Sequence, residues 1–109
     1  MYLYCSRNNI TQLDYLPSSL IELNCNGNDI LQLDNLPLGL QILYCGYNNL
    51  TTLEGAPQSV VGFSCYDNNL TNLKGIEKCV NLEVLNITNN NLNNLKGLEN
   101  LTKLKRLIW

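Results

Sequence analysis

Residues 36–55 read LPLGLQILYCGYNNLTTLEG, and this stretch decides the fold because its pattern recurs along most of the chain. Its cysteine belongs to an evenly spaced series that consists of Cys5, Cys25, Cys45 and Cys65. Three further columns keep the same period: Asn8, Asn28, Asn48, Asn68; Ile10, Ile30, Leu50, Leu70; and Leu13, Leu33, Leu53, Leu73. A fixed period of this length predicts a repeat protein in which each copy is one supersecondary unit.

The repeat changes length in the last third of the chain. After Gly75 each copy is two positions longer, with Ile87 in the cysteine column and Asn90 in the asparagine column. A sixth copy begins at Leu104 and places Trp109 in the cysteine column. We therefore expect a single domain over 1–109, with about five full repeats and a partial sixth. The polar capping elements that solenoids normally carry are missing from both ends of this pattern.

Each column has a physical role. In Leu-x-x-Leu-x-Cys the last two apolar residues are two apart, so they face one side of a strand. One copy cannot bury that side alone, and stacked copies at ~4.8 Å form a parallel sheet over a continuous core. The asparagine follows the strand, where the turn leaves backbone groups that a buried amide can pair. We therefore predict an asparagine ladder through Asn8, Asn28, Asn48, Asn68 and Asn90.

The segments that return from one strand to the next are short. They begin with Leu16-Pro17, Leu36-Pro37 and Ala56-Pro57 in copies two to four. Proline fixes φ and biases the preceding residue to an extended conformation, so we expect extended or polyproline-like segments there rather than helices. The longer copies have room for a short 3₁₀ turn at 77–80 and again at 99–102.

This pattern resembles the leucine-rich-repeat superfamily over essentially the whole chain. Residues 1–75, most clearly 16–75, resemble the 20-residue class with a Leu-Pro start known from bacterial effector proteins that enter host cells. Residues 76–109 resemble the 22-residue repeats of internalins, as in the stretch Gly97-Leu98-Glu99-Asn100-Leu101. One departure is the cysteine column, where effector repeats usually carry an aliphatic residue.

The resemblance implies a fold and a type of activity. It implies an α/β-type leucine-rich-repeat solenoid that is short, right-handed and curved. The parallel sheet would lie on the concave face, with mainly extended or 3₁₀ segments on the convex face. It also implies a non-enzymatic recognition scaffold, because catalysis in the ubiquitin-ligase effectors belongs to a separate C-terminal domain to which nothing here corresponds.

Tyrosines gather on the predicted open face of the sheet. Of the six tyrosines in the chain, all but Tyr15 fall on outward strand positions or just after a strand. Tyrosine offers a large contact area at low entropic cost, although it also favours strands in its own right. We predict that this face binds another protein through Tyr2, Tyr4, Glu22, Asn24, Ile42, Tyr44, Tyr47, Tyr66, Asp67 and Asn86.

Two alternatives to this interpretation stay open. Without caps, the chain could be an assembly segment that forms a homodimer or a stack through Leu3, Ile108 and Trp109. Residues 1–73 hold one base and six acids, whereas residues 74–109 hold six bases and three acids, and this polarity suits head-to-tail stacking. The Tyr and Asn side chains of the face could instead bind a carbohydrate.

Several function classes are disfavoured by what the sequence lacks. The chain has no histidine, no metal-ligand spacing of cysteines and no phosphate-binding glycine loop, so we expect no enzyme activity, metal or cofactor. A net charge of −2 argues against nucleic acid as a partner. No apolar run approaches the ~18 residues of a membrane span, and the N-terminus does not resemble a signal peptide.

The cysteines point to a compartment. They occupy the inward column, where a free thiol behaves as a small buried hydrophobe, and unpaired thiols favour a reducing environment. We therefore expect a cytoplasmic protein, in host-cell cytoplasm if the chain comes from a pathogen or virus. Secretion is the less favoured alternative, and unless the protein is secreted the five Asn-x-Ser/Thr sequons are by-products of an asparagine-rich repeat.

Overall fold

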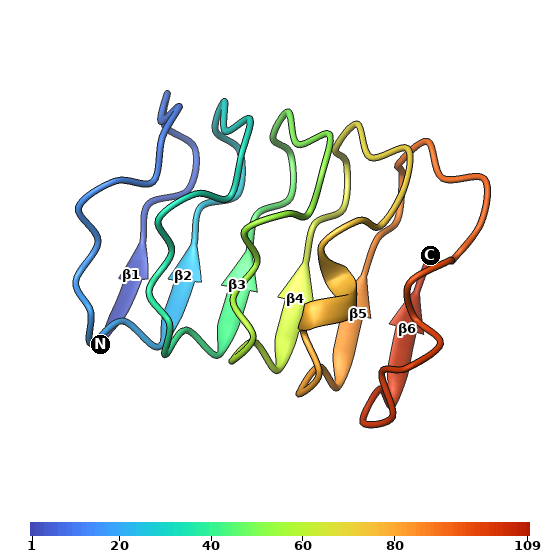
Figure 1. The fold of residues 1–109 in the computed structure, drawn as a ribbon. Coiled ribbons are helices and arrows are strands. Elements are labelled where there is room, and N and C mark those ends of the chain that lie inside the picture. Colours follow the sequence, from blue (N-terminus) through green and yellow to red (C-terminus); the bar gives the residue numbers. More distant parts are fainter.

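The computed structural model describes residues 1–109 as a stack of open coils that share one parallel sheet. Each coil contributes a strand of three residues: β1 (Tyr2–Tyr4), β2 (Glu22–Asn24), β3 (Ile42–Tyr44), β4 (Gly62–Ser64), β5 (Val84–Asn86) and β6 (Arg106–Ile108). The strands follow one another in sequence order, and the two termini lie at opposite ends of the stack (Figure 1). The predicted parallel-sheet solenoid is confirmed, with no α-helix in any coil.

The register of the sheet follows the repeat period. Leu3, Leu23, Leu43, Phe63, Leu85 and Leu107 pair in one line across the six strands. This central residue of each strand faces the core, and the residues on either side of it face outward, because side chains alternate along a strand. A pairing shifted by one residue would expose the whole line, so the sequence pattern fixes the register.

The core is one continuous cluster of 24 buried residues that runs through the stack. Cys25, Cys45, Cys65 and Cys79 are fully buried within it, as predicted, and Cys5 is half-buried. All five cysteines are free thiols. Trp109 occupies the same column as the cysteines but is 69% exposed.

The predicted asparagine ladder is present. The Asn48 side-chain amide nitrogen donates hydrogen bonds to the carbonyls of Cys45 and Gly46 in its own coil and of Cys25 in the preceding coil, at 3.1 Å each. Its oxygen accepts from the backbone N–H of Ile30 in that preceding coil, at 3.0 Å. Asn28, Asn68 and Asn90 repeat this bridge between coils. Asn8, in the first coil, donates only to carbonyls of its own coil.

The return segments of copies two to four are free of helix, as expected, but they are not extended throughout. Each proline opens a tight turn, because Leu20, Leu40 and Val60 each donate a backbone hydrogen bond of 3.2 Å to the proline carbonyl three residues earlier. Proline is compatible with this place, because its carbonyl accepts the hydrogen bond and it has no N–H that would be left unpaired. Two residues before each proline the backbone is already left-handed, at Tyr15 (φ 62°), Asn35 (φ 60°) and Gly55 (φ 94°), so the expected extended segment is broken on both sides of the proline.

Of the two predicted 3₁₀ turns, one is correct and one is wrong. A 3₁₀ turn spans Ile76–Lys78, where Lys78 and Cys79 donate consecutive i→i+3 hydrogen bonds. Residues 99–102 form no such helix. Leu98, Leu101 and Leu104 each bond to a carbonyl three residues earlier, so the hydrogen bonds are spaced three residues apart and close separate turns.

Replacement of Asn48 by alanine should destabilise the protein strongly. The change leaves one buried N–H and three carbonyls without their partner, at a cost of about 3 kcal/mol in the free energy of unfolding. Urea titration followed by circular dichroism measures this loss. The matched control is Asn49→Ala, an exposed neighbour that should stay within ~0.5 kcal/mol of wild type. Equal losses from the two variants would contradict a structural role for the ladder.

Stability should also fall at alkaline pH. Burial raises the pKa of Cys25 and Cys65 to about 12 and that of Cys79 to about 11, above the value near 9 that an exposed thiol shows. A raised pKa in the folded state means that stability is fully present below pH 9 and is lost as the pH rises toward 12. Each buried thiol then removes about 1.4 kcal/mol per pH unit. Urea titrations between pH 8 and 11 would show this slope, and Cys65→Val should reduce it.

Candidate functional site

The outward residues of the six strands, together with the turn residues that follow each strand, form what we call the sheet face. Two columns of outward side chains run across the strands. One consists of Tyr2, Glu22, Ile42, Gly62, Val84 and Arg106, and the other of Tyr4, Asn24, Tyr44, Ser64, Asn86 and Ile108. No helix or loop of the chain covers this face (Figure 1).

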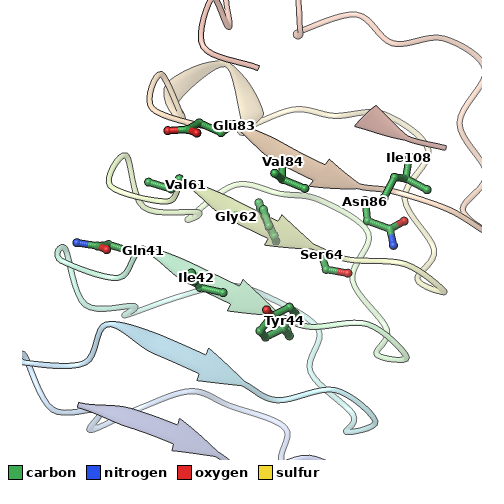
Figure 2. A pocket seen from close by; sticks show the side chains of 11 residues that line it. Gln41, Ile42, Tyr44, Val61, Gly62, Ser64, Glu83, Val84, Asn86 and Ile108 are labelled. Carbon is green, nitrogen blue, oxygen red and sulfur yellow. The ribbon is translucent and has the colours of Figure 1, made fainter. Parts of the chain in front are cut away.

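A shallow groove of about 480 Å³ lies on the sheet face over β3–β6. Gly62 lies in its middle, where the column of outward side chains is interrupted between Ile42 and Val84 (Figure 2). A Cβ atom added to Gly62 would meet only the Cγ1 of Ile42, at 4.0 Å. The missing side chain therefore opens the groove. Its lining combines apolar side chains of Ile42, Val84 and Ile108 with polar side chains of Gln41, Tyr44, Ser64, Glu83 and Asn86.

A second, smaller hollow of about 220 Å³ lies beyond the carboxyl ends of the strands in the first four coils. We call it the edge hollow, and it is lined by Ser6, Arg7, Asn24, Asn26, Gly27, Tyr47 and Tyr66. The rings of Tyr47 and Tyr66 meet edge to face, with centroids 5.2 Å apart and planes at 82°. This arrangement depends on Gly46, because a Cβ there would stand 2.6 Å from the Cζ atom of Tyr66.

The turn residue that precedes each ladder asparagine has a left-handed backbone. Its φ is 58° at Arg7, 70° at Gly27 and 52° at Tyr47, and Asp67 and Asn89 continue the column at 53°. A large side chain pays about 1 kcal/mol for this conformation. Backbone hydrogen bonds between coils hold it, since Arg7 donates to the Asn26 carbonyl at 2.9 Å and Tyr47 to the Tyr66 carbonyl at 3.0 Å. The backbone therefore fixes where Arg7 and Tyr47 stand at the edge of the sheet face.

The predicted site residues fall into three groups. Ile42, Tyr44 and Asn86 line the groove, and Asn24, Tyr47 and Tyr66 line the edge hollow. Tyr2, Tyr4, Glu22 and Asp67 lie on the sheet face outside both hollows. Among these, the Tyr4 hydroxyl donates a hydrogen bond of 3.1 Å to the Glu22 carboxylate.

The sequence interpretation did not select the residues that shape the two hollows. It gave no binding role to Gly46, Gly62, Val84, Arg7 or Gly27, and it gave Ile108 a role only in assembly through the terminal strands. The sequence did contain one signal for the hollows, which is glycine at outward positions of two adjacent copies, Gly46 and Gly62. A glycine there removes a side chain from a column that is otherwise filled.

The charged side chains link neighbouring coils at the surface. Lys74 pairs with Glu54 at 3.2 Å and Lys105 with Glu83 at 3.0 Å. All four side chains are well exposed, so each pair contributes at most about 1 kcal/mol. None of the helical structure is long and apolar enough to serve as a membrane span.

Comparison with known proteins supports the fold independently. No protein-family model and no curated protein matches the chain. Among solved structures, the crystal structure of an internalin, InlF of Listeria monocytogenes, superposes with a TM-score of 0.83 and 27% sequence identity. The match covers 97% of this chain and 33% of the internalin, so the chain spans about a third of that protein's length. Its stacked coils, parallel sheet and asparagine ladder, together with this match, place the chain in the leucine-rich-repeat superfamily.

Proposed function

We propose that the chain is a protein-binding module whose sheet face receives a large apolar side chain of its partner in the groove over Gly62. The observation that carries this proposal is the interruption of the outward column at Gly62, which leaves an open hollow between Ile42 and Val84. The likeness to an internalin supports a binding module of the leucine-rich-repeat type. The choice of partner and of binding face rests on the geometry of the groove.

The lining of the groove suits a protein partner. Its floor is apolar, and its ends carry an amide from Gln41, a hydroxyl from Ser64 and an amide from Asn86. Interfaces that bind well combine an apolar pocket for one anchoring side chain with a polar rim that pairs backbone groups. A Leu, Phe or Met side chain fills such a hollow, and the polar ends bind the peptide groups on either side of it.

Tyrosines extend the contact area around the groove. Tyr44 forms part of the groove wall, and Tyr66 and Tyr47 continue from it toward the edge hollow. Tyr44 is 36% exposed and Tyr47 is 60% exposed, so both present ring surface to a partner. Aromatic side chains in such positions supply a large share of the binding energy at protein interfaces.

Assembly through the terminal strands remains the alternative proposal. It involves Leu3 in β1 and Ile108 and Trp109 at β6. Ile108 also lines the groove, so a charged substitution there would disturb both candidate surfaces. Trp109, 69% exposed and outside the groove, separates them: Trp109→Glu should abolish assembly but leave binding in the groove intact.

Filling the groove should abolish binding. We expect peptides selected from a displayed random library on the wild-type chain to lose about tenfold or more in affinity for Gly62→Val, because the added side chain occupies the anchor position. Valine favours strands, so this variant should fold. The matched control is Gly39→Val, since a Cβ at Gly39 meets nothing within 4 Å and this residue lies outside the groove. Selected peptides that bind both variants equally well would disprove the groove as the binding site.

The tyrosine contribution can be measured separately. The double variant Tyr44→Ala, Tyr66→Ala should weaken binding of the same selected peptides by at least about tenfold, since both rings border the hollows. The control is Tyr15→Ala, because Tyr15 is fully exposed and is the one tyrosine outside the sheet face. Fluorescence anisotropy with labelled peptides gives the affinities. An unchanged affinity in the double variant would remove the tyrosines from the binding surface.

A further inference from the structure

We propose that the edge hollow binds a carboxylate, supplied by an aspartate or glutamate side chain of the partner. This inference rests on the proposed function, because it assigns a second contact to the same bound protein. The hollow brings together a guanidinium, two side-chain amides and two tyrosines, and no acidic residue lines it. The following features support a carboxylate as its ligand.

Arg7 supplies an unpaired positive charge. It is the only base in residues 1–73 and makes no ion pair within the chain, whose two ion pairs involve Lys74 and Lys105. Its stem lies beside Gly27, where an added Cβ would stand 3.5 Å from the Arg7 Cγ. The absence of a side chain at Gly27 keeps space open between Arg7 and Tyr47 in their column. A guanidinium in such a space can bind a carboxylate through two parallel hydrogen bonds.

The amide groups of Asn24 and Asn26 add donors at the same place. The Asn26 side-chain oxygen accepts from the Gly46 N–H at 2.6 Å, and the Asn24 oxygen accepts from the Asn26 N–H at 3.1 Å. A backbone N–H is a donor, so it fixes the oxygen of each amide toward the backbone. The NH₂ group of each amide then has no hydrogen-bond partner in the protein and is free to donate to a ligand.

The surroundings favour a single negative charge over a double one. Residues 1–73 carry six acids besides Arg7, and these repel a phosphate, with a charge of −1.5 to −2, more strongly than a carboxylate. Two of these acids already have hydrogen-bond donors of their own. Glu22 accepts from the Tyr4 hydroxyl at 3.1 Å, and Asp14 accepts from the Asn35 amide at 2.8 Å.

The edge hollow and the groove adjoin each other on one face. Tyr66 lines the edge hollow and follows Ser64 of the groove by two residues in the same coil. One partner segment can therefore place an apolar side chain over Gly62 and an acidic side chain beside Arg7. This arrangement predicts that peptides selected on the chain carry an acidic residue at a fixed distance from their apolar anchor.

Nuclear magnetic resonance titration of the ¹⁵N-labelled chain tests the carboxylate site directly. The probes are N-acetyl-glutamate N-methylamide, its glutamine counterpart and inorganic phosphate. Blocked glutamate should shift the side-chain NH₂ signals of Asn24 and Asn26 and the Nε–H signal of Arg7. Blocked glutamine and phosphate should each bind at least about tenfold more weakly, because one lacks the charge and the other carries too much of it.

Substitutions test whether Arg7 is the group that binds the carboxylate. Arg7→Gln and Arg7→Gly should both lose the shifts caused by blocked glutamate, and glycine is fully compatible with the left-handed backbone at this position. The control Lys96→Gln removes an exposed positive charge far along the stack and should leave the titration unchanged. A folded Arg7→Gly variant that still binds blocked glutamate would overturn the proposal. So would equal shifts from glutamate and glutamine, tighter binding of phosphate, or no shifts at all.

The test of the edge hollow can be distinguished from the test of the groove. Gly62 does not line the edge hollow, so Gly62→Val should bind blocked glutamate as the wild type does. If blocked glutamate binds but the selected peptides bind Gly62→Val as tightly as the wild type, the proposed function is wrong and the carboxylate site in the edge hollow is supported. If the selected peptides lose affinity for Gly62→Val but none carries an acidic residue whose contribution is lost in Arg7→Gln, the carboxylate site is wrong and the groove is supported.

Discussion

The hydrogen bonds of the buried asparagines are the constraint on which the rest of this structure depends. Strands of three residues make few backbone bonds of their own, and each short coil must reverse direction directly after its strand. At that reversal the ladder asparagine pairs carbonyls of two coils and an N–H of the preceding coil. A buried side-chain amide makes several such bonds at once, which no aliphatic residue could replace. The ladder thus fixes both the turn within each coil and the spacing between coils.

The cysteine column belongs to the same arrangement. The carbonyl of Cys45 accepts from both Asn48 and Asn68, so the backbone of this column is the acceptor line of the ladder. The thiol also contributes, since the Sγ atom of Cys25 lies 3.4 Å from the Tyr44 carbonyl in the next coil and can donate to it. A small side chain with a weak donor therefore fits a position that is apolar but borders backbone carbonyls of the next coil. Ile87 fills the same place in the first of the longer copies without a donor.

Sequence reasoning reached those features that repeat and missed those that occur once. The strands, their register, the buried cysteines and the asparagine ladder follow from columns that four copies share, because the same physical demand recurs in each coil. The hollows follow from single residues. Gly62 and Gly46 look like weak strand positions in one copy each, and their effect appears only when neighbouring coils supply the walls. The missing 3₁₀ turn at 99–102 likewise depends on which local hydrogen bonds form, and composition alone leaves that choice open.

Inward and outward positions have separate roles in this fold, so residues of the sheet face can differ between copies. Inward positions, ladder asparagines and turn prolines are tied to folding, so they repeat with little change along the chain. Outward positions are not needed for folding in this way, and a substitution there costs little stability. A glycine in an outward column therefore opens a hollow about two strand spacings wide, roughly 10 Å, between side chains of the coils on either side. Moving that glycine by one copy would move the hollow by one strand. Under the proposed function, the positions of a few glycines therefore set where a partner's side chains can enter, while the ladder beneath keeps the walls in place.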